Sequence, residues 1–309
     1  SYLFFNDDDI KLSTNIKISD KFLDTYKAIY NSKLDKNFLK YIDTNNTLAY
    51  FSMSMNTENM LREYPKLMTN IYGNMLPQFK EETAIGLELM EVLFDEKAIG
   101  ELITGDIMFV LNDVAEREIT YTSYTYDDDY NREEVTKTKK ELMPDFTVML
   151  GSENRSLITK LMKLSLKHRL SEANGQIFKL NKQMTKAPFD MFYTIKDNIV
   201  FLTNSENQIN SISSNSFKSN IGKHKKLLKK NIVVGYADVK KLLSKMPTNL
   251  IGPKQAELLK YMQNNVGEVI TTASKVKKGK FYTDQIIKTS GKDGNSLRFI
   301  LKTIERFAH

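Results

Sequence analysis

The chain has 309 residues, of which 41% are apolar and 27% charged, a balance that is ordinary for a globular protein and excludes disorder of the whole chain. It contains no cysteine, which excludes a disulfide, a thiolate nucleophile and a Cys-ligated metal within these residues. The two halves of the chain carry opposite net charge. Residues 1–155 hold 17 Lys+Arg against 28 Asp+Glu, a net of −11, and residues 156–309 hold 28 against 10, a net of +18. No apolar run approaches the roughly 18 residues of a membrane-spanning helix, and the first residues lack the pattern of a signal peptide.

The first half of the chain is predicted to begin with helices. Phe22, Leu23 and Tyr26 recur at helical spacing, so a helical lead-in is expected over residues 1–46. The elements expected after it are a strand over 48–55, an amphipathic helix from Thr57, two helices within 78–103, a strand over 107–111, and a hairpin of strands 119–126 and 133–140 around a polar tip.

The second half is predicted to repeat this strand-helix order. Residues 48–67 and 145–164 match at a shift of 97 positions, which places Phe51 on Val148 and Leu61 on Ile158. The elements expected there are strands over 146–150, 176–180, 191–195, 199–203, 232–236, 266–274 and 280–289, and helices over 156–170, 253–262 and 297–307, with a short helix capped by Asp238.

Helices and antiparallel hairpins alternate without a regular βαβ rhythm, which favours an α+β fold over a doubly wound sheet. We therefore expect two related units of antiparallel hairpins packed with amphipathic helices. The boundaries expected are residues 1–143 for an acidic α+β unit and residues 144–309 for a basic α+β unit that repeats the strand-helix pattern.

Known catalytic and cofactor motifs do not occur. His168, His224 and His309 lack metal-ligand spacing, and the acidic run 127–129 fails as an EF-hand loop. The Ser-x-x-Lys pattern at 274–277 lies on a predicted hairpin rather than at a helix start, so we interpret it as a chance match. No phosphate-binding glycine motif is present, and we expect no metal and no cofactor. Spacing alone cannot reveal a catalytic carboxylate pair, so a hydrolase or transferase of that kind stays open.

Two lysine-rich stretches are the strongest positive signal for a binding surface. They could engage phosphates, anionic head groups or an acidic protein surface, including the acidic half of the same chain. The alternative is a solvated helix end and a charged hairpin that prevents edge pairing. The candidate anion- or partner-binding residues are Lys223, Lys225, Lys226, Lys229, Lys230, Lys277, Lys278 and Lys280.

Five segments together resemble a family of exported Bacteroidetes lipoproteins that is defined only as a domain of unknown function. They are GELITGDIMFVLND (100–113), DFTVMLGSENRSLITKLMKL (145–164), MFYTIKDNIVFLTNSENQI (191–209), NIVVGYADVKKLL (231–243) and SLRFILKTIERF (296–307). The resemblance covers roughly residues 46–309 and consists of apolar strands and turns rather than an active-site motif. It implies a cell-envelope location with a lipid tether on an N-terminal Cys, a residue that this sequence lacks.

The sequence thus leads to three functional hypotheses. The first is a non-enzymatic binding or scaffold protein of the cell envelope, whose partner is an envelope protein or an amphiphile. The second is a carboxylate-dependent hydrolase or transferase of the envelope. The third is a polyanion-binding module that uses the lysine-rich second half, although an exported location disfavours nucleic acid as its partner.

Overall fold

The computed structural model describes residues 1–309 apart from 31, 76–80, 82–84, 87–94, 127–129, 186, 248–251, 293 and 308–309. Its strands are β1 (Tyr2–Phe5), β2 (Asp9–Lys17), β3 (Ala49–Ser54), β4 (Asp106–Tyr126), β5 (Arg132–Gly151), β6 (Ser171–Asn174), β7 (Ile177–Leu180), β8 (Phe192–Lys196), β9 (Ile199–Thr203), β10 (Asn231–Asp238), β11 (Val266–Ser274) and β12 (Lys280–Thr289). Its helices are α1 (Asp20–Tyr30), η1 (Lys36–Tyr41), α2 (Thr57–Met75), α4 (Glu96–Leu102), α5 (Arg155–Lys167), α6 (Lys182–Thr185), α7 (Glu206–Ser213), α8 (His224–Lys230), α9 (Val239–Ser244), α10 (Pro253–Asn265) and α11 (Ser296–Phe307).

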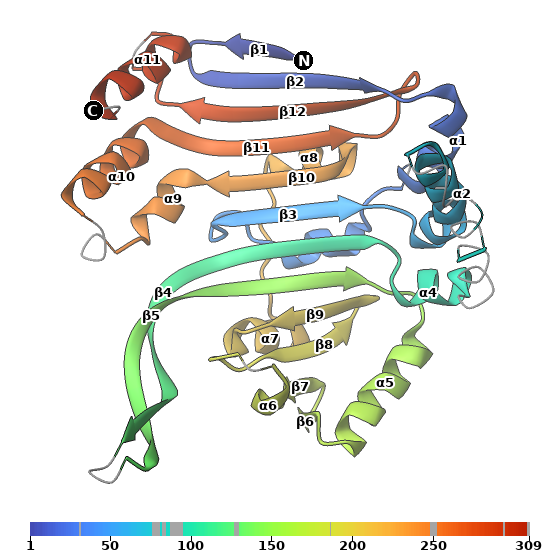
Figure 1. Cartoon of the computed structure of the whole chain (residues 1–309), viewed down its shortest axis with the longest axis vertical. Coiled ribbons are helices and arrows are strands. Elements are labelled where there is room, and N and C mark those ends of the chain that lie inside the picture. The colour runs from blue at the N-terminus through green and yellow to red at the C-terminus, as the bar shows by residue number, and fades with distance from the viewer. Residues whose placement is uncertain are drawn as a thin grey trace.

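All these strands join one twelve-stranded antiparallel sheet, in the order β1-β2-β12-β11-β10-β3-β4-β5-β9-β8-β7-β6 (Figure 1). The sheet with its helices confirms the predicted α+β class. Strands β4 and β5 continue beyond the sheet as a long hairpin, and their register shifts between Leu111 and Asp113, where β4 carries an extra residue. Such a bulge bends a strand pair, so it accounts for the place where the hairpin leaves the plane of the sheet.

The hydrophobic core lies on one face of the sheet, under η1, α7 and α8. Alternate residues of the central strands point into it because side chains of a strand alternate between faces. Met108, Phe201 and Val234 are fully buried there, and the helices contribute Phe38 and Ile209 among others. This layer is the only part of the described structure where large apolar side chains gather with no exposure to solvent.

Helices α1 and α5 pack on the opposite face, near its ends. The ring of Tyr26 in α1 meets Phe281 of β12 edge-on at 5.7 Å. The Ser165 hydroxyl of α5 lies 2.8 Å from the hydroxyl of Tyr193 in β8. Phe281 and Tyr193 both belong to the face that points away from the core, so these two helices border that face and leave its middle uncovered (Figure 1).

The predicted helical lead-in is wrong for its first part. Residues 2–5 and 9–17 form β1 and β2, and helical structure begins only at Asp20. Ile10, Leu12 and Ile16 recur with the period of two that a strand requires. This alternation marks the strand that pairs with β12, and the helical spacing of Phe22, Leu23 and Tyr26 applies only to α1.

Most other predicted elements are confirmed. Strands β3 and β7 to β12 lie where expected, and Asp238 caps α9 by accepting a hydrogen bond from the Lys241 amide at 3.0 Å. Helix α7 follows β9, and the first of the two helices predicted within 78–103 falls mostly outside the described residues. One sheet holds strands from both predicted units, and β5 crosses the boundary drawn at 143/144, so the division into two units stays a prediction. Within the described residues, no helix has the length and hydropathy of a membrane span.

Candidate functional site

The face of the sheet opposite the core is apolar, and the residues that the structure describes cover only about half of it. Phe51 of β3 pairs with Phe109 of β4, which pairs with Val148 of β5. Phe51 is 44% exposed and Phe109 38% exposed, although both lie in the middle of the sheet. We call this surface the open face and define it by Phe51, Met53, Ile107, Phe109, Val148, Leu150, Val200, Leu202 and Val233, none of which is buried.

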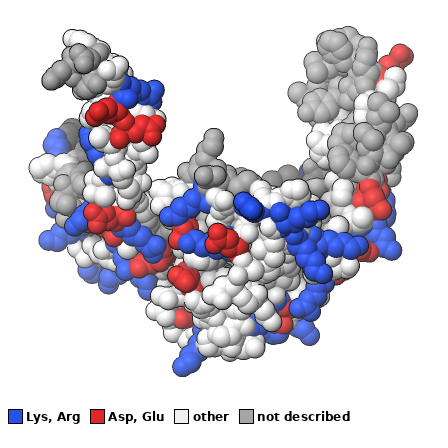
Figure 2. All heavy atoms as spheres, turned by 90° about the horizontal axis from the view of Figure 1, so that it is seen from below, with Lys and Arg blue, Asp and Glu red and all other residues white. Residues whose placement is uncertain are grey.

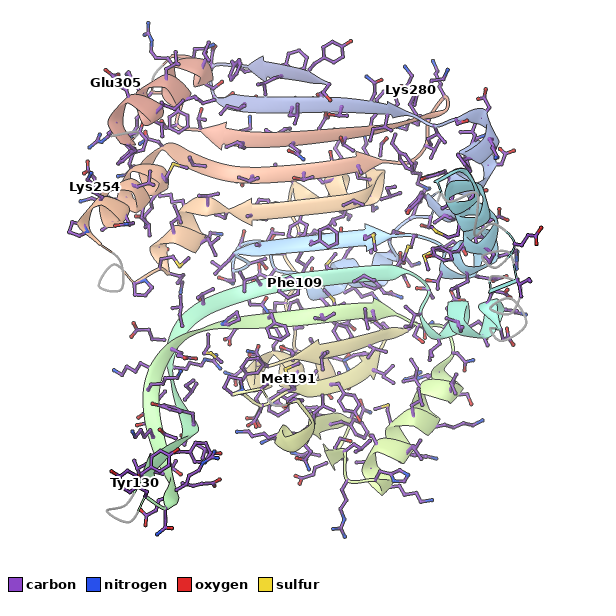
Figure 3. The ribbon with its side chains drawn as sticks, viewed as in Figure 1. Phe109, Tyr130, Met191, Lys254, Lys280 and Glu305 are labelled. Atoms are coloured by element: carbon purple, nitrogen blue, oxygen red, sulfur yellow. The ribbon has the colours of Figure 1, made fainter. Side chains whose placement is uncertain are left out.

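The open face lies in a hollow of the molecule. Figure 2 shows this side concave, with the β4–β5 hairpin standing at the left edge, and Figure 3 labels Phe109 at the centre and Tyr130 at the hairpin end. Residues 107–111 of β4 are apolar on both faces of the strand, a pattern typical of strands that are covered on both sides. The described structure covers only one of these sides in the middle of the sheet, so an apolar surface of this size is a candidate binding site.

The hairpin displays tyrosines along its length. Tyr121, Tyr124, Tyr126 and Tyr130 are between 39% and 86% exposed. The Arg132 guanidinium lies 3.3 Å from the centre of the Tyr124 ring, and the Lys139 ammonium lies 5.0 Å from that of Tyr121. Tyrosine and arginine are enriched among the residues that dominate protein–protein binding, so the hairpin extends the candidate surface beyond the sheet.

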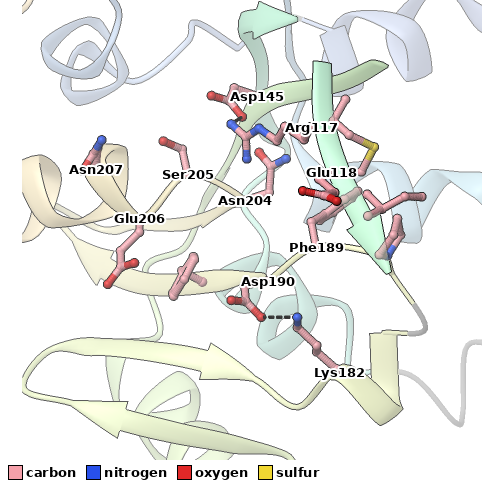
Figure 4. Close-up of a pocket in the computed structure, with 14 residues that line it drawn as sticks. Arg117, Glu118, Asp145, Lys182, Phe189, Asp190, Asn204, Ser205, Glu206 and Asn207 are labelled. Atoms are coloured by element: carbon pink, nitrogen blue, oxygen red, sulfur yellow. Dashed lines mark hydrogen bonds and ion pairs between the residues drawn. The ribbon is translucent and has the colours of Figure 1, made fainter. Parts of the chain in front are cut away.

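A separate polar cleft of about 460 Å³ lies between the base of the hairpin and the start of α7 (Figure 4). Arg117 of β4 and Asp145 of β5 form an ion pair on one wall. Lys182 lies 3.3 Å from Asp190 on the other wall, and the cleft also holds Glu118. The remaining lining residues named in Figure 4 are Phe189, Asn204, Ser205, Glu206 and Asn207.

The two paired carboxylates of the cleft differ in acidity. Burial raises the pKa of Asp145, an effect that the Arg117 charge reduces and the Asp113 charge increases. Burial also raises the pKa of Asp190, but hydrogen bonds from Lys179 and Lys182 outweigh it and leave that pKa below its ordinary value. Two carboxylates held at different acidities are a feature of acid–base sites, and ion-pair networks of purely structural importance also produce it.

The predicted lysines converge on one end of the sheet. Lys225, Lys226, Lys229 and Lys230 are exposed on α8, while Lys277, Lys278 and Lys280 lie at the β11–β12 turn. Asn231 pairs with Ser274, which brings the end of α8 beside the start of that turn, and Lys280 pairs with Lys17. No described acidic side chain forms an ion pair with the four α8 lysines. Lys223 differs from them because its ammonium lies 2.7 Å from a Glu268 carboxylate oxygen.

His224 serves the core rather than a metal site. It is buried, its Nδ1 lies 2.9 Å from the Tyr50 hydroxyl, and its ring meets that of Tyr236 edge-on at 4.4 Å. Burial lowers its pKa and so favours the neutral ring. Across the described residues, no group of three or more His, Asp or Glu side chains could hold a metal ion.

Sequence reasoning missed the cleft because its charged residues come from five separate segments of the chain. It could have found the open face, since every residue of the run IMFVL (107–111) is apolar, on both faces of the strand. Comparisons with family models, curated proteins and solved structures find no match for this chain.

Proposed function

We propose that this protein is a non-enzymatic binding or scaffold protein of the cell envelope, and that it holds a protein partner on the open face. The observation that carries the proposal is the half-exposed Phe51–Phe109 pair in the middle of the sheet. Isolated exposed apolar residues are common in monomers, but contiguous apolar patches usually mark interaction sites.

The size of the open face favours a protein over a small molecule. Five strands about 4.8 Å apart, each contributing about 17 Å of length, give roughly 400 Å² of sheet. A partner in a standard complex contributes about 800 Å², so the open face with the tyrosines of the hairpin supplies much of such an interface. A single alkyl chain would leave most of this surface in contact with water.

The charges beside the open face favour a partner with an acidic rim. Helix α5, which borders the face, carries Arg155, Lys160, Lys163 and Lys167 and no acidic residue. Complementary charge at the rim accelerates association and selects among partners. The partner that fits is therefore a protein whose apolar patch is bordered by Asp and Glu side chains.

The envelope location rests on the resemblance of residues 46–309 to exported lipoproteins, and a lipid tether on a preceding Cys belongs to the same proposal. We also propose that the chain contains an internal repeat. The pairs β3–β4 and β5–β9 lie next to each other in the sheet, and α2 and α5 follow their first strands in the same way. These positions agree with the sequence match between residues 48–67 and 145–164 at a shift of 97 positions.

The experiment is photo-cross-linking in the native host, with a benzophenone amino acid at Phe109 and, as a matched control, at Lys226 on the core-side helix α8. A cross-linked protein found at Phe109 and absent at Lys226 is then identified and purified. The Phe51→Ser/Phe109→Ser variant is expected to bind it at least about 100-fold more weakly than wild type, because two aromatic anchors are lost. Equal affinity of this variant and wild type would refute the proposal.

The polar cleft supports a second candidate, a carboxylate-dependent hydrolase or transferase. The specific observation is the pair Asp145 and Asp190, whose pKa values are shifted in opposite directions within one cleft. A panel of ester, glycoside and phosphoester substrates would test it. Turnover that Asp145→Asn abolishes and Lys160→Gln leaves unchanged would support it, and the absence of turnover on every class would count against it.

The converging lysines support the third candidate, a polyanion-binding module. Reversing Lys225, Lys226, Lys229 and Lys230 to Glu should flatten the salt dependence of binding to heparin, because fewer counterions are then released. An unchanged slope would remove this candidate.

A further inference from the structure

A groove separate from the polar cleft lies between α5 and the β6–β7 hairpin. It encloses about 450 Å³. Met162 and Leu166 of α5 form one wall, Phe178 of β7 belongs to the other, and Ile195 of β8 contributes to the floor. These side chains are all apolar, and the volume lies in the range typical of small-molecule sites.

The walls of this groove are held in place by hydrogen bonds and ring contacts. The hydroxyl of Tyr193 lies 2.8 Å from that of Ser165 in α5 and 3.0 Å from that of Ser171 in β6. The Phe178 ring stacks on the Tyr193 ring at 5.0 Å. Tyr193 thus joins the helix to the hairpin, so the groove exists before any ligand enters it.

The charged residues that line the groove all have the same sign. They are Arg155 and Lys163, and the lining includes no acidic side chain. Both cations are exposed, and no ion pair joins either of them to a described Asp or Glu. Eight residues separate them on α5, or about 12 Å along the helix axis, so two long side chains can approach one anionic group from opposite sides.

We propose that this groove binds an amphiphile that has one apolar chain and an anionic head. The chain would lie against Met162, Leu166 and Phe178, and the head would lie between Arg155 and Lys163. A carboxylate and a phosphate share the required chemistry, because each accepts charge-assisted hydrogen bonds from guanidinium and ammonium groups. This site shares Arg155 and Lys163 with the charged border of the open face, and the pairing of Ile195 with Val200 connects the groove floor to that face.

The test measures displacement of 11-(dansylamino)undecanoic acid from the purified full chain. Wild type is expected to bind one probe molecule and to release it to dodecanoate more readily than to uncharged dodecanol. In Arg155→Gln/Lys163→Gln the affinity for dodecanoate should fall about tenfold or more, the effect of losing charge-assisted hydrogen bonds at a partly exposed site. The affinity for dodecanol should stay the same.

Two further variants keep the test informative. Lys160→Gln/Lys167→Gln removes the same charge from α5 outside the groove lining and should bind dodecanoate as wild type does. Ala173→Trp places a large ring in the groove from an exposed position of β6 and should lose both ligands. No probe binding by wild type, undiminished binding by Ala173→Trp, or equal loss in the two charge variants would each overturn the proposal.

The source of the amphiphile is decided by comparing dodecanoate with a lysophosphatidic acid of the same chain length. Tighter binding of the first indicates a free fatty acid, and tighter binding of the second indicates a phospholipid product. The variant Phe51→Ser/Phe109→Ser should keep the wild-type affinity for both, so failure of the protein-binding proposal and failure of this one give different results.

Discussion

One face of the sheet is buried in the core and the other is half exposed. The same Phe→Ala substitution should therefore lower the free energy of unfolding by different amounts on the two faces. Phe201 is fully buried on the core face, where its ring meets that of Tyr41 edge-on at 4.7 Å. Phe201→Ala removes a large buried side chain and leaves a sealed cavity, so it should reduce the free energy of unfolding by about 3–5 kcal/mol. Phe109 is 38% exposed on the open face. Phe109→Ala loses only part of that burial, and water can enter the space, so about 1–2 kcal/mol is expected.

Urea denaturation followed by circular dichroism measures both variants against wild type. Because the two substitutions expose similar surface on unfolding, the slopes with urea should agree and the midpoints should differ. Phe201→Ala is expected to have clearly the lower midpoint. If Phe109→Ala shifted the midpoint as far as Phe201→Ala, the open face would be packed like the core, and the reasoning would be refuted.

Three more predictions concern single residues. Gly105 has φ +96°, and a Cβ added there would lie 2.4 Å from the Met55 carbonyl oxygen, so Gly105→Ala should lower the free energy of unfolding by about 2 kcal/mol or more. A Cβ added at Gly175 meets nothing within 4 Å, so Gly175→Ala should lower it by less in the same urea assay. Burial lowers the pKa of His224, so below about pH 6.5 the unfolded chain binds a proton that the folded chain does not, and the free energy of unfolding should fall as the pH drops. The urea midpoint of His224→Gln should fall less over the same pH range than that of wild type. Asp238→Ala removes the α9 cap and should cost about 1 kcal/mol, measured by thermal unfolding, and no change in midpoint would show that the cap is not needed.

Local patterns predicted most of the fold because each predicted element carries its own signal. The hairpin predicted from strands 119–126 and 133–140 is the outer part of the β4–β5 pair, and the strands predicted over 191–195 and 199–203 are β8 and β9. The order of strands was not predictable in this way. The neighbours β3 and β10 are separated by about 180 residues, and β2 pairs with β12 across nearly the whole chain.

Some candidate sites can be identified from a local stretch of sequence, and others form only when distant segments meet in the tertiary structure. The lysine-rich stretches are local, so sequence alone identified them, but their meeting at one end of the sheet depends on the pairing of Asn231 with Ser274. The cleft and the α5 groove draw their residues from distant segments and carry no local motif. The open face is apolar by composition, yet whether another element covers it is a property of the tertiary structure alone.

The most direct test of the open face as a binding surface is thiol labelling, since the chain contains no cysteine. Single cysteines are introduced as Phe109→Cys on the open face, Met149→Cys in the core and Lys226→Cys on α8. In the purified protein, Cys at 109 and 226 should react quickly with a maleimide, and Cys at 149 should not. In intact cells of the native host, we predict that Cys at 109 becomes protected while Cys at 226 stays reactive. Equal labelling of Cys at 109 in cells and in the purified protein would contradict the account.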